Sequence, residues 1–139
     1  MSAEFHTNYR EETLISRLEN SRQSAWGRQL SQLGECIEEL SQRLALKLVD
    51  NHIVETTNQQ EVEGQLAIGL NDLLQAEDFD IQYLIAPVRN LMDRPNRMSL
   101  YITAYILEKL IKHRSVVDIF GTDEEVYATV NQEVTRLIR

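Results

Sequence analysis

The sequence predicts an all-α fold of five to six helices in one domain, and three observations support this prediction. Apolar side chains recur at steps of three and four residues along most of the 139 positions, while two-residue alternation is nearly absent. Polar patterns typical of helix N-termini occur at Asn58 and at Thr122. Five scattered Gly, two Pro and no low-complexity run leave nothing that would divide the chain.

A first helical stretch is expected from about residue 11 to residue 52. Between Trp26 and Leu44 the apolar steps are 4, 3, 4, 3 and 4, a heptad-like seam that lets one helix lie along another. Gly27 and Gly34 interrupt this seam, and each costs about 1 kcal/mol relative to Ala inside a helix. The stretch is therefore either one helix bent near Gly34 or two helices.

The next two helices follow from a cap and a proline. Asn58 can accept from the first free backbone N–H groups, and Glu61 can bond back to it, ahead of the apolar stripe Val62 to Leu74. A further stripe from Ile81 to Met92 passes through Pro87, which predicts a helix kinked or restarted there. Arg94-Pro95-Asn96 then forms a turn.

The C-terminal part repeats this arrangement. A helix is expected over residues 98–113, capped by Asn96 or Ser99, and the β-branched segment 115–121 is expected to be a connector, briefly extended. Thr122 with Glu125 makes a second capping box before a last helix that ends near Ile138.

Residues 40–74 and 102–138 correspond to each other in kind. Lys47-Leu48-Val49 matches Lys109-Leu110-Ile111, and, after a short insertion, Asn58 matches Thr122. An internal duplication would require the two hairpins to pack on each other about a rough two-fold axis. The alternative is that any two amphipathic hairpins agree this well. The expected parts are an N-terminal extension (1–36), two hairpins (37–75 and 97–139) and a connecting helix (79–93).

The same residues carry a family resemblance. Leu46-Lys47-Leu48-Val49, His52-Ile53-Val54-Glu55 and Gln60-Glu61-Val62-Glu63, then residues 113–120 and Glu124-Glu125-Val126-Tyr127, resemble the two halves of the bacterial domain-of-unknown-function family 507. The resemblance covers roughly residues 37–139, and the N-terminal extension and Pro87 depart from it. It implies a bacterial cytosolic helical protein and no catalytic residue.

Composition restricts the class of protein. The formal net charge is −8, which opposes general binding of polyanions. A single cysteine cannot form a disulfide within the chain. The first ten residues show no secretory signal, and no segment reaches the roughly 18 consecutive apolar residues of a membrane span. We therefore expect a cytoplasmic protein.

Candidate chemistry is sparse. His6, His52, His113 and Cys36 lack the paired spacing of a zinc site, no phosphate-binding or nucleophile motif occurs, and no metal or cofactor is predicted. Cys36 lies beside the seam and is interpreted as a packed thiol rather than a nucleophile. A carboxylate site assembled across helices stays open, because sequence spacing does not show which acids converge.

Cations are concentrated in one segment, residues 89–114, which holds six basic and two acidic residues. The simpler interpretation is a solvated face, partly favoured by a helix C-terminus. The alternative is a contact surface for an anionic protein or nucleic acid. Its candidate residues are Arg89, Arg94, Arg97, Lys109, Lys112 and Arg114.

The leading hypothesis is a non-enzymatic protein that acts through protein–protein contact and forms a homodimer through its N-terminal helix. Residues 19–29 are strongly polar apart from Ala25 and Trp26, so the seam is too narrow to be core alone and part of it is expected to face another chain. The interface candidates are Trp26, Leu30, Leu33 and Ile37. The alternative hypothesis is binding of a polyanion through residues 89–114.

Overall fold

The computed structural model describes the backbone of residues 2–110, 117–119 and 121–138 and the side chains of residues 24–110 and 121–138. In chain order the helices are α1 (Ser2–Asp50), α2 (Gln59–Gln75), α3 (Asp78–Ile85), the short 3-10 helix η1 (Ala86–Val88), α4 (Arg97–Glu108) and α5 (Asp123–Leu137). The all-α prediction is confirmed. The predicted connector contains strand β2 (Val117–Ile119), which pairs antiparallel with β1 (Val54–Thr56).

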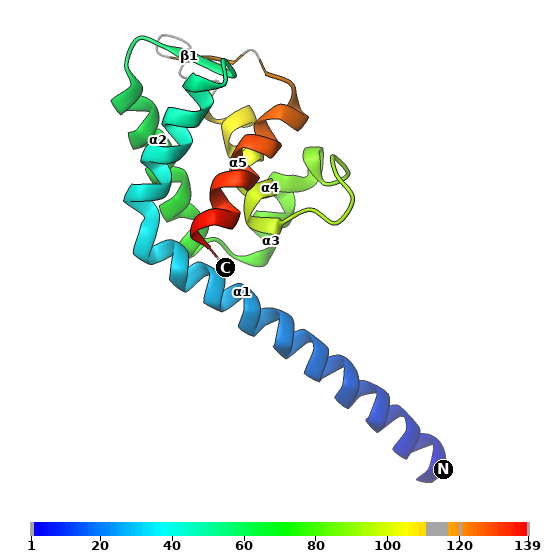
Figure 1. Ribbon diagram of the computed structural model, residues 1–139. Coiled ribbons are helices and arrows are strands. Elements are labelled where there is room, and N and C mark those ends of the chain that lie inside the picture. Colours follow the sequence, from blue (N-terminus) through cyan, green and yellow to red (C-terminus); the bar gives the residue numbers. More distant parts are fainter. Residues whose placement is uncertain (1, 111–116, 120, 139) are drawn as a thin grey trace.

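Helix α1 is longer than predicted and is bent. It begins at Ser2 rather than near residue 11, and its N-terminal half extends away from the rest of the molecule (Figure 1). The bend predicted near Gly34 is confirmed, because Cys36 leaves the helical conformation with φ −128° and ψ 19°. Past this bend the helix turns into the body and packs against α2 and α5.

The C-terminal end of α1 is closed by a residue in the left-handed conformation. His52 has φ 59°, its N–H donates to the carbonyl of Val49, and the N–H of Ile53 donates to the carbonyl of Leu48. This pair of bonds is the Schellman motif, which satisfies the last free carbonyls of a helix. It reverses the chain into β1.

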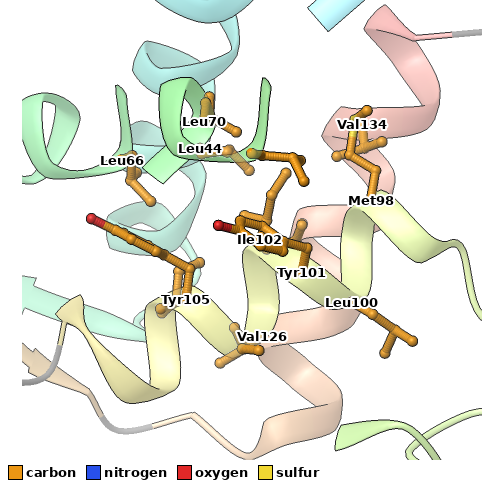
Figure 2. Close-up of a cluster of buried hydrophobic side chains, with 14 of the residues drawn as sticks. Leu44, Leu66, Leu70, Met98, Leu100, Tyr101, Ile102, Tyr105, Val126 and Val134 are labelled. Atoms are coloured by element: carbon orange, nitrogen blue, oxygen red, sulfur yellow. The ribbon is translucent and has the colours of Figure 1, made fainter. Parts of the chain in front are cut away.

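The hairpins α1–β1–α2 and α4–β2–α5 pack on each other as predicted. Helix α1 contacts α5, and α2 contacts α4. In both contacts the first helix of one hairpin packs against the second helix of the other hairpin. Strands β1 and β2 pair about Glu55 and Asp118, so one strand comes from each half. Figure 2 shows side chains from four helices meeting in the shared core: Leu44, Leu70, Ile102 and Val134.

Buried positions in the two halves correspond along the sequence. On the first helix of each hairpin, Ser41 and Thr103 are both buried, and each hydroxyl donates to the carbonyl four residues earlier. This agreement at polar positions favours the duplication over a coincidence of apolar spacing. The matching buried apolar pairs are Leu40 with Ile102, Leu44 with Ile106, Leu48 with Leu110, Val62 with Val126, Leu66 with Val130 and Leu70 with Val134.

Both predicted caps are present, although only one is reciprocal. The side chain of Thr122 accepts from the Glu125 N–H, and the Glu125 carboxylate accepts from the Thr122 N–H, a complete capping box. Asn58 accepts from the Glu61 N–H, but the Asn58 N–H donates to the hydroxyl of Thr56 instead of to Glu61. The predicted back-bond of Glu61 is therefore wrong.

The helix in the connecting segment is shorter than predicted. Helix α3 ends at Ile85, and Pro87 lies in η1, so the predicted restart at the proline is confirmed but the helix does not continue to residue 93. Helix α4 ends at Glu108 rather than near residue 113, and its cap is Asn96, which accepts from the Ser99 N–H. Helices α3 and η1 both pack on α4.

Candidate interaction surface

The surface where α1 leaves the body is organised around Trp26. Its ring is half-buried and lies under the guanidinium of Arg97 from α4, whose Cζ is 4.7 Å from the ring centroid. Arg97 also forms an ion pair with Asp78 at the start of α3. A cation over an indole contributes about 0.5–1 kcal/mol at exposed sites. Three helices are thus joined at this point, through one arginine.

Two exposed aromatic side chains lie on α3, the helix that begins at Asp78. Phe79 directly follows Asp78 and is 76% exposed, and Tyr83, one helical turn later, is 77% exposed. Side chains four residues apart share one face of a helix, so α3 presents an aromatic pair to solvent. We call Trp26, Asp78, Phe79, Tyr83 and Arg97 the junction surface. This aromatic pair was not identified from the sequence. The available signal was that Phe79 and Tyr83 do not belong to the apolar stripe that runs from Ile81 to Val88, which places them on another face of the helix.

The predicted interface residues of the seam all contact the body of the same chain to some degree. Leu33 is fully buried, and Leu30 and Ile37 are half-buried against the core of the same chain. Leu33 is therefore a core residue, and its prediction as an interface side chain is wrong. Trp26 is the seam residue nearest to the projecting part of α1.

The predicted basic segment does not form a face of free cations among the side chains that the structure describes. Arg97 is held by Asp78 and Trp26, the Arg89 guanidinium donates to the carbonyl and side chain of Gln82, and the Lys109 ammonium lies 5.9 Å from the Tyr105 ring centroid. Arg94 is exposed, with φ 51°. Lys112 and Arg114 lie outside the described residues. Polyanion binding stays a prediction.

The body contains one buried ion pair that sequence reasoning also missed. The Arg43 Nε on α1 donates to Glu133 Oε2 on α5 across 2.8 Å, and Glu133 is fully buried. Its other oxygen, Oε1, has no hydrogen-bond partner. The available signal was position, because Glu133 lies three residues after Val130 and falls on the apolar stripe of α5. The burial of the Glu133 carboxylate is therefore explained by its ion pair with Arg43, which is a structural contact between α1 and α5.

Among the side chains that the structure describes, three titratable groups have shifted pKa values, and burial is the first cause in each. Burial raises the pKa of the Cys36 thiol, with Glu39 and Glu35 adding to the shift, so the thiolate needed for nucleophilic attack is disfavoured. Burial, then the nearby Asp72, raises the pKa of Tyr101 to about 12. Burial and Asp72 also raise the pKa of Tyr105, whose hydroxyl donates to the Gln65 carbonyl.

Metal-ligand clusters and membrane-spanning helices are not found in the described parts of the chain. No group of three or more His, Cys, Asp or Glu side chains there could hold a metal ion. His52 is exposed, while the side chains of His6 and His113 lie outside the described set. None of the described helices has the length and apolar character needed to cross a membrane.

No family model matches the chain, and neither a curated protein nor a solved structure is significantly similar to it. The resemblance to domain-of-unknown-function family 507 accordingly stays a prediction.

Proposed function

We propose that this protein is a non-catalytic cytosolic interaction module that forms a homodimer through the projecting part of α1. The observation that carries the proposal is the separation of this helix from the body: the part of α1 that precedes Trp26 runs outward, with no other described element alongside it in Figure 1. The helix enters the body at the junction surface.

Helix energetics support a partner for this segment. Most of the stability of a helix in a protein comes from packing an apolar face, because intrinsic propensity barely offsets nucleation. The projecting sequence carries Leu14, Ile15 and Leu18, with Leu14 and Leu18 one turn apart. A second copy would supply the same stripe. A two-fold symmetric pairing of the two stripes gives a closed dimer, because no stripe is left over to bind a third copy.

The junction surface supports a partner from the side of the body. Aromatic and arginine side chains supply the largest contributions at protein interfaces, and this surface offers Arg97 over Trp26 and, on α3, the exposed rings of Phe79 and Tyr83. Because Phe79 and Tyr83 are more than three-quarters exposed, covering them would remove a large apolar area from water. We infer that the partner helix reaches this surface.

Multi-angle light scattering on a matched pair of variants tests the proposal. Leu14→Asp with Leu18→Asp places two charges on the apolar face, whereas Ser16→Asp with Asn20→Asp places the same charges about 200° further round the helix. We expect the first variant to have the 16.1 kDa mass of one chain and the second to keep the mass of the unmodified protein. Phe79→Ser with Tyr83→Ser should weaken association.

The design avoids Leu33, because a charge at a fully buried position would unfold the chain whether or not it dimerises. Far-UV circular dichroism and the thermal midpoint of the body show that each variant is folded. Equal masses for the two double-aspartate variants, or an unmodified chain that is monomeric at all concentrations, would refute dimerisation through this helix.

A further inference from the structure

The first hairpin carries an open groove along its outer side. It lies between α1 and α2, has a volume of about 600 Å³, and spans positions 34–42 of α1 and 60–71 of α2. At a rise of 1.5 Å per residue these spans are roughly 12 and 16 Å long, the length of two to three helical turns. The groove is lined by, among others, Gly34, Glu35, Glu38, Glu63, Gly64 and Ala67.

Small residues keep this groove open. A Cβ added at Gly64 would meet nothing within 4 Å, and one added at Gly34 would meet only the end of Leu74 at 3.9 Å. Ser41 also lines the groove, and its hydroxyl is already bonded to the Ile37 carbonyl. A partner backbone could therefore approach closely without displacing a side chain.

Charge in the groove has one sign. Glu35 and Glu38 come from α1 and Glu63 from α2, so carboxylates stand on both walls, and no Lys, Arg or His among the described residues lines the groove. None of these three carboxylates forms a salt bridge with a described side chain. An occupant would have to neutralise them, which favours a cationic one.

On the second hairpin, the residues that correspond to the groove residues of the first hairpin are covered by other parts of the chain. Tyr127, which corresponds to Glu63, is 4% exposed, and its hydroxyl accepts from the Asn96 N–H. Leu100, which corresponds to Glu38, is 3% exposed and points away from the central core cluster (Figure 2). Arg97, which corresponds to Glu35, is held by Asp78 of α3.

Residues 78–96, which run from α3 to the turn before α4, pack on the second hairpin at two positions whose counterparts on the first hairpin line the groove: Asp78 pairs with Arg97, and the Asn96 N–H donates to the Tyr127 hydroxyl. The covered face is apolar or paired, and the open face is acidic. We infer that the groove of the first hairpin receives a short basic helix from a different protein, as the second hairpin is covered by residues 78–96 of its own chain. This site is separate from the projecting part of α1 and goes beyond the proposed dimer.

A second copy of this chain fits the groove poorly on charge. Helices α2 and α3 contain no Lys or Arg, α4 has one basic and one acidic residue, and α1 and α5 have more acidic than basic residues. Inserting α2, α3, α4 or α5 would place mostly neutral or negative surface against three carboxylates. A partner helix with Lys or Arg on both flanks of a small-residue stripe complements the groove.

A selection experiment tests the inference on the full chain. A displayed library of helical peptides about four turns long, randomised at surface positions and unbiased in charge, is selected against the protein, and the enriched peptides are synthesised. We expect enriched peptides with net positive charge and small residues on one stripe. Their dissociation constant should rise at least tenfold for Glu38→Lys with Glu63→Lys, and also for Gly64→Leu with Ala67→Leu.

The matched control places the same charge change on the other hairpin, with Glu108→Lys and Glu124→Lys at positions outside the groove. This control should keep the affinity of the unmodified protein. No enriched peptide, enrichment of neutral or acidic peptides, or equal loss in the control would overturn the inference. The groove variants should leave the solution mass unchanged; if they lower it, the groove is a self-association site and a foreign basic helix is refuted. Failure of the dimer would instead appear only in the Leu14 and Leu18 variant.

Discussion

Arg43 and Glu133 form a buried ion pair at the place where the other half of the molecule puts an aromatic ring over a glycine. In the alignment of the two halves, Arg43 corresponds to Tyr105 and Gly69 corresponds to Glu133. The Arg43 Nε donates to Glu133 Oε2 between α1 and α5, and Tyr105 of α4 packs on Gly69 of α2. One pair of corresponding positions thus holds an ion pair, and the other pair holds a tyrosine ring packed on a glycine.

Breaking the ion pair from one side should destabilise the protein strongly. Arg43→Met leaves the carboxylate of Glu133 buried without its cation, and we expect a loss of about 3 kcal/mol in the free energy of unfolding. Urea unfolding at neutral pH measures this. The double variant, Arg43→Met with Glu133→Met, should recover most of the loss because no charge remains buried. A double variant as unstable as the sum of the single changes would show that the two side chains do not interact.

Two glycines of α2 should respond in opposite directions to alanine. At Gly69 a Cβ would lie 2.7 Å from the Tyr105 ring, so Gly69→Ala forces the ring to move and should cost about 2 kcal/mol. At Gly64 the space is open, and Gly64→Ala should stabilise by about 0.5–1 kcal/mol through helix propensity. Thermal unfolding of both variants checks the sign. Equal stability would mean that Tyr105 does not pack on Gly69.

The left-handed residue that ends α1 can be improved. His52 is exposed and has φ 59°, a conformation that glycine adopts without strain, so His52→Gly should raise the free energy of unfolding by about 1 kcal/mol. Asp50→Gly is the control, because Asp50 is still helical and should lose about 1 kcal/mol there. Denaturant midpoints distinguish the two, and a destabilised His52→Gly would argue against the Schellman motif.

Alkaline pH should destabilise the fold through Tyr101. Burial raises its folded-state pKa from 10.0 to about 12, so between these values the unfolded chain releases a proton that the folded chain keeps. The contribution of Tyr101 to stability is therefore complete below pH 10 and declines as the pH rises toward 12. Urea unfolding at several pH values should show a flatter decline for Tyr101→Phe. An unchanged decline in that variant would assign the effect to other groups.

The sequence was most informative where local chemistry decides the structure. The caps at Asn58 and Thr122, the bend near Gly34 and the break at Pro87 are set by residues within a few positions of each other. The helical period likewise identified the core, since its apolar stripes supply most of the buried side chains.

Features that depend on contacts distant in sequence were not predictable. The pairing of Val54 with Ile119 joins two three-residue strands too short to show alternation. Burial of Glu133 depends on Arg43 in the other half of the chain, and exposure of Phe79 depends on which side of α3 meets α4. Leu33 was assigned to an interface because periodicity does not distinguish a core within the chain from a contact between chains.

Sedimentation equilibrium of the unmodified chain over a wide range of concentrations is the most direct test of the dimer. We expect a mass above 16.1 kDa that falls toward that value on dilution, with loss of far-UV helical signal as the projecting part of α1 loses its partner. A mass of 16.1 kDa and a constant helical signal at every concentration would contradict it.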